Sequence, residues 1–410
     1  MMKVPTGIFD VLPDEQAFWD NVENIFQGVA SSFGFEKIKT SFWEDKNLYQ
    51  NRFQDIERAH TNEKNQVVLR PDFIFSLIRA YNEHGLYRNI HPLKLFYVGP
   101  TFDPNETHRI GLEMLGVDSA FSDAFLIGLI KTVYEKLGLI DIIFQVNSVG
   151  CSSCQNKIKK ALTNYYSDYL RSICPACQTL FSQNPLKLLS CRHEGCQEIQ
   201  TQSPALTEFL CDHCKSNFKE VLEYLDDLEV PYDFNPRLVG HSNYFSKTVF
   251  DVHHDGNDLS LGNGGRHDAL FKNLSGQQNG AIGFTSKIKN IIKQLKQRNV
   301  GLNRQPKPIL YLIHLGNLAK KKSLPILFHL HDSGFRIYSS HYADNLKTQL
   351  ENAQEIGSSY ALILGQREAK ENSIIVRDML DGSQETVDDH KLLDFLKKRL
   401  GGALKIKKME

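Results

Sequence analysis

The sequence lacks a net charge, an apolar run of membrane length, and cysteine outside one short segment. Its 410 residues include 48 lysines and arginines against 48 aspartates and glutamates. This balance argues against a chain that coats nucleic acid through a generally basic surface, although it leaves room for a locally basic face. No run stays apolar over the length that a bilayer-spanning helix needs. We therefore expect no membrane contact.

The first residues also lack the basic stretch and apolar core of a secretory signal. We therefore expect a cytoplasmic protein. All eight cysteines lie between Cys151 and Cys214. In a reducing compartment, thiols are more often metal ligands or buried core residues than partners in disulfides. The segment that contains them is therefore expected to have a chemistry of its own.

The sequence does contain enough apolar residues for sizeable cores. A hydrophobic fraction of 41% excludes a wholly disordered chain, and the length suggests two or three domains. Strand-like segments at 93–99, 112–118 and 141–147 follow one another too often for a simple βαβ alternation, so we expect a largely antiparallel sheet with flanking helices. Glycine, asparagine and two prolines at 298–308 predict a linker before a separate α/β domain.

The cysteines form four pairs. These are Cys151 with Cys154, Cys174 with Cys177, Cys191 with Cys196, and Cys211 with Cys214. Two thiolates in a tight turn can bind one tetrahedral ion, and a second pair completes its coordination. Eight thiols suffice for up to two zinc ions, but the spacing leaves open which pairs combine. We expect structural zinc, with a core of buried free thiols as the alternative, and we expect His193 and His213 to be solvated rather than ligands.

Six segments and a tail carry a family likeness. In order, they are PTGIFDVLP at 5–13, LRPD at 69–72, LFYVGPTF at 95–102, RLV to TVFDV at 237–252, LGNGGRHDAL at 261–270, AIGF at 281–284, and the tail at 345–387. The segments resemble those of histidyl-tRNA synthetase, a class II aminoacyl-tRNA synthetase. The tail resembles that family's C-terminal anticodon-binding domain. The likeness covers nearly the whole chain.

The resemblance implies an α+β fold and a homodimer. It predicts a class II antiparallel sheet with helices in 1–148 and 233–300, a cysteine-rich inserted domain at 149–232 that approaches the tRNA acceptor stem, and an anticodon-binding-like domain at 308–403. The implied chemistry is adenylation: the histidine carboxylate attacks the α-phosphate of ATP, usually with Mg²⁺, and the acyl group then passes to tRNA. The anionic transition state needs fixed cations, for which arginine is well suited.

Three arginine positions of the family hold other residues. They are Asp103 in the second class II motif, Gly240 in the histidine-site motif and Asn290 in the third motif. One guanidinium placed on a transferring phosphoryl group contributes about 10³–10⁵ in rate. The cations that could substitute are Arg109, Lys247, Lys287 and Lys289. Substitution would also need new geometry, so we predict no catalytic residue.

The resemblance also implies a set of ligand-binding positions. Its members are Arg70, Asp72, Asp118, Tyr244, Phe245, Gly262, Gly264 and Gly265. Asp72 would hold the substrate's amino group, and Met114 and Asp118 align with the glutamine and glutamate that read the substrate. Tyr244 and Phe245 would form an aromatic floor, although core packing explains them equally well. The glycines retain the family's glycine turn.

The leading hypothesis is a histidyl-tRNA synthetase-like paralogue that forms no histidyl-adenylate and binds tRNA or other RNA, a histidine-like small molecule or a protein partner. Lysine clusters at 157–160, 287–296, 320–322 and 397–408 fit phosphate contacts. The alternative is an active histidine–tRNA ligase, which would use ATP and Mg²⁺. A second alternative is a regulatory subunit of ATP phosphoribosyltransferase, although such subunits generally lack the C-terminal domain.

Overall fold

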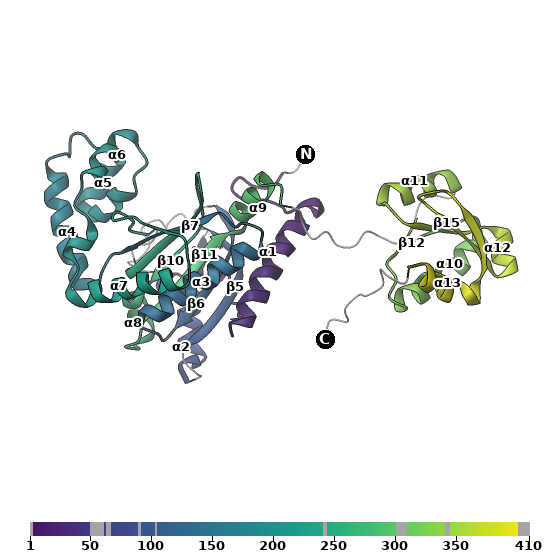
Figure 1. The fold of residues 1–410 in the computed structure, drawn as a ribbon, viewed down its shortest axis with the longest axis horizontal. Coiled ribbons are helices and arrows are strands. Elements are labelled where there is room, and N and C mark those ends of the chain that lie inside the picture. The colour runs from purple at the N-terminus through teal and green to yellow at the C-terminus, as the bar shows by residue number, and fades with distance from the viewer. Residues whose placement is uncertain are drawn as a thin grey trace. The chain divides into compact units, whose positions relative to one another are not determined.

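The computed structural model describes residues 3–49, 61–62, 67–88, 92–102, 105–240, 244–300, 310–340 and 345–400. The chain divides into two units, Met1–Leu302 and Asn303–Glu410. Their division falls inside the predicted linker, of which residues 301–308 lie outside the described part. Each unit is described by itself (Figure 1).

An eight-stranded sheet forms the centre of the first unit, in the order β1-β5-β6-β11-β10-β9-β7-β8. The strands are β1 (Glu36–Lys37), β5 (Leu93–Phe102), β6 (Glu106–Leu115), β7 (Ile142–Ser148), β8 (Tyr232–Phe234), β9 (Ser246–His254), β10 (Asn257–Arg266) and β11 (Ala281–Lys287). The six central strands pair antiparallel, and only the edge strands β1 and β8 pair parallel. The antiparallel sheet expected from the sequence is therefore confirmed.

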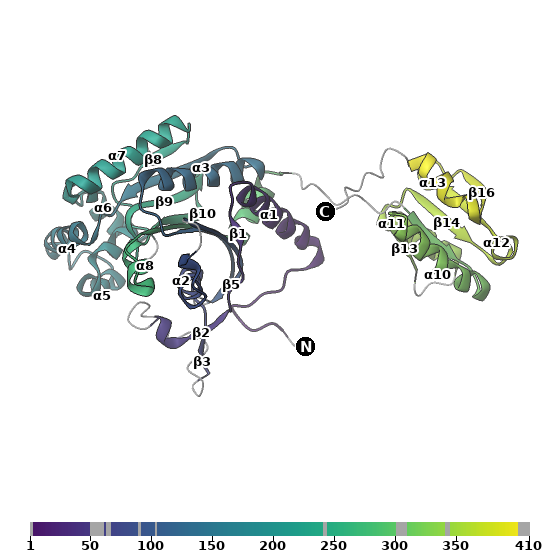
Figure 2. The ribbon, with the colours of Figure 1, turned by 90° about the horizontal axis from the view of Figure 1, so that it is seen from below.

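Helices cover both faces of this sheet. They are α1 (Pro13–Ser32), α3 (Ala120–Lys136) and α9 (Ile288–Gln297) on one face, and α2 (Phe73–Glu83) and α8 (Asp268–Ser275) on the other. Figure 2 shows α2 and α8 on the concave side of the curved sheet and α1 and α3 on the convex side. A small sheet of β2 (Trp43–Asp45), β4 (Val67–Leu69) and β3 (Thr61–Asn62) completes this part, with the short helices η1 (Lys46–Tyr49) and η3 (Leu86–Arg88).

The alternation of side chains along β6 decides which residues can reach the concave face. Leu112 and Met114 pack into the core under α1, α3 and α9, while Leu115 packs with α2. Because neighbouring strand residues point to opposite faces, Glu113 points to the concave side with Leu115. Met114 therefore lies in the convex core, away from the Asp72 side of the sheet.

The cysteine-rich insert is helical and lies between β7 and β8. Its helices are α4 (Ser152–Ser167), α5 (Pro175–Gln183), η4 (Pro185–Ser190), α6 (Glu194–Thr201), η5 (Leu206–Phe209) and α7 (Asp212–Asp227). Ile158, Leu162 and Tyr166 of α4 share one core with Phe245 and Val249, at the start of β9. The insert therefore packs directly against the sheet and belongs to the first unit.

The second unit has a five-stranded sheet in the order β13-β12-β14-β15-β16, whose first three strands run parallel. The strands are β12 (Leu310–His314), β13 (Ile337–Ser339), β14 (Tyr360–Leu364), β15 (Ser373–Asp378) and β16 (Gln384–Asp388), and the helices are α10 (Asn317–Asp332), α11 (Leu346–Ile356), α12 (Gln366–Glu371), η6 (Asp389–Lys391) and α13 (Leu392–Leu400). Separate apolar cores cover its two faces, which explains the continuous hydrophobic strands. Among the described residues, no helix has the length and apolar character to cross a membrane.

Candidate functional site

Arg70 is buried and fully engaged in holding the chain around it. Its Nε donates to the Pro100 carbonyl at 2.9 Å, its Nη1 donates to Thr40 Oγ1 at 2.9 Å, and its guanidinium carbon lies 3.5 Å from the centroid of the Phe73 ring. Burial lowers the pKa of Arg70 to about 10. These contacts place Arg70 as a link between β5 and the segment before β2.

Asp72 and Tyr244 are brought together across 172 residues of sequence. Asp72 caps α2, and its Oδ1 accepts from the Ile74 N–H at 3.0 Å, a favourable role for aspartate at a helix start. Its Oδ2 accepts from the Tyr244 hydroxyl at 2.8 Å. The Tyr244 ring in turn lies 5.1 Å from that of Phe245, centroid to centroid. The predicted amino-group carboxylate and aromatic floor therefore touch.

Asp118 faces two cations of the protein itself. Lys247 Nζ lies 2.6 Å from Asp118 Oδ1 and 3.2 Å from Asp268 Oδ2, and Arg266 Nη2 lies 3.3 Å from Asp118 Oδ1. Burial raises the pKa of Asp118, but the hydrogen bond from Lys247 and the charge of Arg266 outweigh it and lower the pKa. The carboxylate that aligns with the substrate-reading position therefore forms ion pairs with two cations of the protein itself.

The same ion network extends into the core. Arg266 and Asp123 both have fully buried side chains and form an ion pair. Thr248 Oγ1 donates to Asp123 Oδ2 at 2.6 Å, and Arg266 Nε lies 3.2 Å from Asp268 Oδ1. Sequence reasoning missed this network. Its visible signal was the Arg266–Asp268 spacing inside LGNGGRHDAL, which says nothing of Asp123 on α3.

Glu113 and His267 form a second buried polar contact on the concave face. Glu113 Oε2 lies 3.5 Å from His267 Nε2, and within the described part of the chain neither atom has a hydrogen-bond partner. Burial, and then the charge of Asp72, raise the pKa of Glu113 well above its usual value, and burial lowers the pKa of His267 to about 3. Each shift therefore favours the neutral form of its group. Sequence reasoning missed this pair as well.

The three predicted glycines lie inside strand β10 rather than in a turn. A Cβ on Gly262 would come within 2.5 Å of Phe284 Cζ, and one on Gly264 would overlap the Phe250 ring. A Cβ on Gly265 would lie 2.7 Å from the Thr248 carbonyl oxygen. Core rings and neighbouring backbone therefore account for these glycines without a ligand.

Two of the three positions at which the family has arginine lie among the described residues. Asp103 lies outside the described residues. Gly240 has a φ of +73°, and a Cβ there would lie 2.6 Å from Phe245 Cδ2. Asn290 Nδ2 donates to the Ser260 carbonyl at 2.8 Å. Neither described position therefore presents a cation.

The candidate substitute cations have partners of their own. Lys247 is held by Asp118 and Asp268, as described above. Lys289 Nζ lies 2.9 Å from the centroid of the Phe9 ring, and Arg109 Nε donates to Thr101 Oγ1 at 3.2 Å. Lys287 lies opposite Arg109 in the pairing of β11 with β6. Arg109 and Lys287 are thus the two cations placed together.

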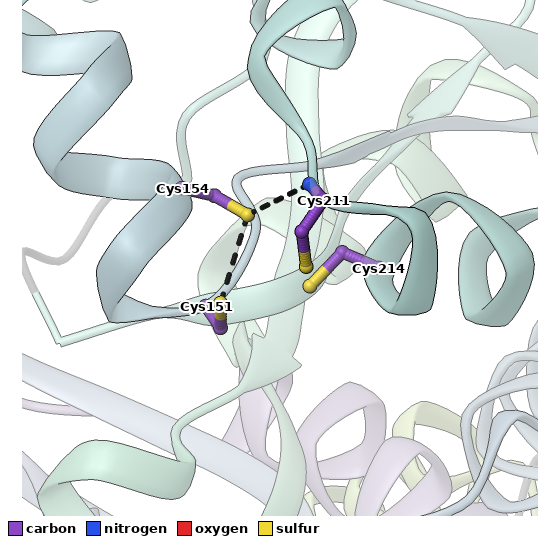
Figure 3. Close-up of side chains that lie close together, drawn as sticks. All are labelled: Cys151, Cys154, Cys211 and Cys214. Carbon is purple, nitrogen blue, oxygen red and sulfur yellow. Dashed lines mark hydrogen bonds between the residues drawn. The ribbon is translucent and has the colours of Figure 1, made fainter.

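The eight cysteines gather into two sets of four. The outer cluster is Cys151, Cys154, Cys211 and Cys214, and the inner cluster is Cys174, Cys177, Cys191 and Cys196. In each, the four sulfurs lie within 4.8 Å of one another (Figure 3 shows the outer cluster). The first pair therefore combines with the last, and the second with the third. Among the described residues, neither His193 nor His213 belongs to either group of four.

Helix starts explain how the sulfurs converge. Cys151, Cys174 and Cys211 each occupy the N-cap position of a helix, and their partners follow in its first turn. The Cys211 N–H donates to Cys154 Sγ at 3.1 Å. Burial raises the pKa of Cys151, but hydrogen bonds from Ser153 and Cys154 outweigh it and lower the pKa to about 6. These donors favour the thiolate of Cys151, whereas burial raises the pKa of its neighbour Cys154.

The spacing of the sulfurs fits a zinc ion. Tetrahedral zinc with Zn–S bonds of about 2.3 Å separates its sulfurs by about 3.8 Å. Cys151 and Cys154 have sulfurs 3.6 Å apart, and those of Cys174 and Cys191 are 3.8 Å apart. All eight thiols are free of disulfides. Each cluster therefore supplies four ligands of the right kind at the right spacing.

Comparisons with known proteins agree with the fold. The family model described as histidyl-tRNA synthetase matches residues 7–291, and the anticodon binding domain model matches 313–399. Histidine–tRNA ligases of Pelotomaculum thermopropionicum and Dehalococcoides mccartyi are each 30% identical, over 97% and 98% of this chain and 98% and 100% of their own. The apo Staphylococcus aureus histidyl-tRNA synthetase structure has a TM-score of 0.82 at 26% identity, over 97% of this chain and all of its own.

A further structural match shows the fold alone. A Bacillus halodurans protein titled as an ATP phosphoribosyltransferase regulatory subunit/histidyl-tRNA synthetase has a TM-score of 0.62 at 18% identity, over 89% of this chain and 98% of its own.

Proposed function

Because the chain belongs to the histidyl-tRNA synthetase family, we propose that it is a member of that family that forms no histidyl-adenylate and acts through RNA, ligand or partner binding. The fold and both family domains are retained. What has changed is the set of side chains that adenylation needs. The proposal concerns those side chains and the groups that now occupy their places.

The ion pair of Lys247 with Asp118 is the observation that carries the proposal. By the family resemblance, Asp118 stands where a carboxylate reads the amino-acid substrate. Lys247 Nζ lies 2.6 Å from that carboxylate, and Arg266 adds a second cation at 3.3 Å. A ligand that took Asp118 Oδ1 from Lys247 would leave a largely buried ammonium with Asp268 alone. Such a displacement is costly because the lysine loses both water and its partner.

The phosphate side of the site supports the same proposal. An adenylation transition state needs cations fixed where negative charge develops. Gly240 cannot supply one, and Phe245 occupies the space beside its Cα. Asn290 is neutral and engaged with the Ser260 carbonyl. Of the four candidate substitutes, Arg109 and Lys287 lie opposite each other in the pairing of β6 with β11, and Arg109 donates to Thr101.

Polar groups of the protein pair with one another on the amino-acid side of the concave face. Glu113 contacts His267, and Tyr244 donates to Asp72. Glu113 and His267 present no solvent-accessible polar atom at their contact. In the proposed function, these groups satisfy one another where a substrate's polar groups would otherwise be held.

We propose RNA binding for the second unit, on the match of residues 313–399 to the anticodon binding domain. Lys320–Lys322 lie on α10 and Lys397–Arg399 on α13. Such charges give salt-dependent affinity for phosphate. Binding of a transcribed tRNA to the full chain should weaken steeply with salt, and binding that is absent at low salt would remove this part of the proposal. A homodimer is proposed from the family resemblance.

We also propose that both cysteine clusters bind structural zinc and that the protein works in the cytoplasm, where thiols stay reduced. The support is the spacing of the sulfurs, the donors to Cys154 and Cys196, and the absence of disulfides. Metal analysis of protein purified without added zinc should give two zinc ions per chain. A zinc content near zero with eight titratable thiols would contradict it.

An active histidine–tRNA ligase is the competing function, and 30% identity to curated ligases over nearly the whole chain favours it. In that case ATP and Mg²⁺ would bind the concave face, with Arg109 and Lys287 as the cations available. The regulatory-subunit alternative has the fold in its favour, while the anticodon-type domain counts against it.

Histidine-dependent exchange of pyrophosphate into ATP separates these functions. We expect the purified full chain to give no exchange above a blank without histidine, under conditions where a histidine–tRNA ligase serves as positive control. Robust exchange that Asp72→Ala abolishes would establish the active ligase instead. Asp20→Ala, on the exposed side of α1, is the matched control and should leave any exchange unchanged.

A further inference from the structure

The two cysteine clusters have different surroundings. The inner cluster lies within the insert, where Cys177 and Cys196 pack with Tyr166 and Leu188. The outer cluster lies where the insert joins the sheet, and Cys154 and Cys214 form a small apolar group with Leu210. The two clusters therefore contact different parts of the protein.

One route from the outer cluster leads to Lys247 through the backbone. Gly150 precedes Cys151, and its carbonyl accepts from the Lys247 N–H at 2.8 Å. The Val149 N–H donates to the Lys247 carbonyl, also at 2.8 Å. Gly150 has a φ of +69°, and a Cβ there would overlap Cys154. The outer cluster thus packs against the backbone that holds Lys247, with no room for a side chain between them.

Lys247 itself is held in an unusual backbone conformation. Its φ is +49°, in the left-handed region that a residue with a side chain rarely adopts. Such a conformation persists only where the surrounding structure imposes it. The two hydrogen bonds to Val149 and Gly150 impose it here, and they place the side chain where Nζ reaches Asp118.

A hydrogen bond also joins the two cysteine pairs of the outer cluster to each other. The Cys211 N–H donates to Cys154 Sγ at 3.1 Å. Both pairs are therefore linked to the segment whose backbone holds Lys247.

We infer that a zinc ion in the outer cluster positions Lys247 against Asp118 and so keeps the amino-acid side of the concave face closed, whereas the inner cluster only holds the insert together. This inference rests on the zinc binding proposed above. Without the outer ion, Cys151 and Cys211 are no longer tied, and the segment that fixes the Lys247 backbone can move. The inner cluster shares with this region the apolar core that contains Phe245 and Val249.

The test compares two matched cysteine variants of the full chain. Cys214→Ser removes a buried ligand in the first turn of α7, and Cys196→Ser removes one in the first turn of α6. Each variant should lose one of two zinc ions. Acylation of Lys247, followed by mass spectrometry, then reports whether its amine is held. We expect Cys214→Ser to raise the rate by about tenfold or more through local opening, and Cys196→Ser to leave it within about twofold.

A third variant guards against simple unfolding. Cys151→His keeps a nitrogen ligand for zinc and should retain two ions and slow acylation. Equal acylation in Cys214→Ser and Cys196→Ser, or no increase in Cys214→Ser after it has lost one ion, would overturn the inference while leaving the zinc proposal intact. A wild-type chain without zinc would defeat the zinc proposal and the inference with it.

Discussion

The concave face of the sheet and the cysteine-rich insert differ in how their functional side chains are partnered. On the concave face, the chain keeps the family's backbone, but its charged groups satisfy one another, as Lys247 does with Asp118. In the insert, eight cysteines from four segments converge into two complete sets of ligands. The difference teaches that a retained fold does not say which site is in use. Side chains that are arranged for a ligand which the chain does not itself supply indicate the site in use. In this protein they are the cysteine thiols.

Removing zinc should have the largest effect on stability, and the loss should fall on the insert. Structural zinc contributes on the order of 10 kcal/mol per ion in small zinc-binding peptides. A chelator should therefore remove hydrogen-exchange protection from α4, α5, α6 and α7 while the second unit keeps its own. Equal protection with and without chelator would show that the clusters are buried thiols.

Breaking the buried end of the ion network should have the next largest effect. Arg266→Met leaves Asp123 buried without its charged partner, which costs about 3–5 kcal/mol. Both tryptophans, Trp19 and Trp43, lie in the first unit, so their fluorescence during urea unfolding reports its stability. The control is Lys219→Ala, whose ion pair with Glu223 is exposed and is worth at most about 1 kcal/mol.

A methyl group added to a glycine of β10 should lower the stability of the first unit. Gly264→Ala places a Cβ against the Phe250 ring, and overpacking of this kind costs about 1–3 kcal/mol. Gly28→Ala is the matched control, because nothing lies within 4 Å of its Cβ in helix α1. It should stabilise the same unfolding transition slightly. A neutral result for Gly264→Ala would instead indicate a cavity at this place.

The Glu113–His267 pair should make the free energy of unfolding depend on pH. The slope should be about 1.4 kcal/mol per pH unit for each proton taken up or released on unfolding. The pKa of His267 is lowered to about 3 in the folded state, so the unfolded chain binds its proton first and stability falls as pH drops from about 6.5 towards 3. The pKa of Glu113 is raised, so stability falls as pH rises above about 4.5.

These two slopes can be separated by substitution. His267→Asn should flatten the acidic side of the urea stability profile, and Glu113→Gln should flatten the other side. Unchanged profiles in both variants would mean that the pair titrates normally and is not sealed from water.

Much of the fold was predictable because it depends on local patterns. Six motifs in order and the run of strand-like segments identified the antiparallel sheet, the insert and the second unit. The cysteine pairing was not predictable, since each pair has similar spacing and only the chain path between β7 and α7 brings Cys151 to Cys211. Met114 aligns with a substrate-reading position but packs into the convex core, while the period of two along β6 puts Glu113 on the concave face.

The candidate site was less predictable for the same reason. Lys247 was considered as a substitute cation, but its partner Asp118 is 129 residues away. Glu113 and His267 meet only because β6 and β11 are paired and β11 lies beside the end of β10. Long-range pairing of this kind leaves no trace in spacing or composition. The predicted roles of Arg70 and the three glycines have structural explanations that no local pattern distinguishes from binding.

A calorimetric titration of the full chain with histidine tests the central claim most directly. If Lys247 and Arg266 hold Asp118 and the concave face is filled by the protein's own groups, millimolar histidine should give no saturable heat. Saturable binding of one histidine per chain, lost in Asp72→Ala, would contradict the account, because it would show that the pocket still opens for the family's substrate.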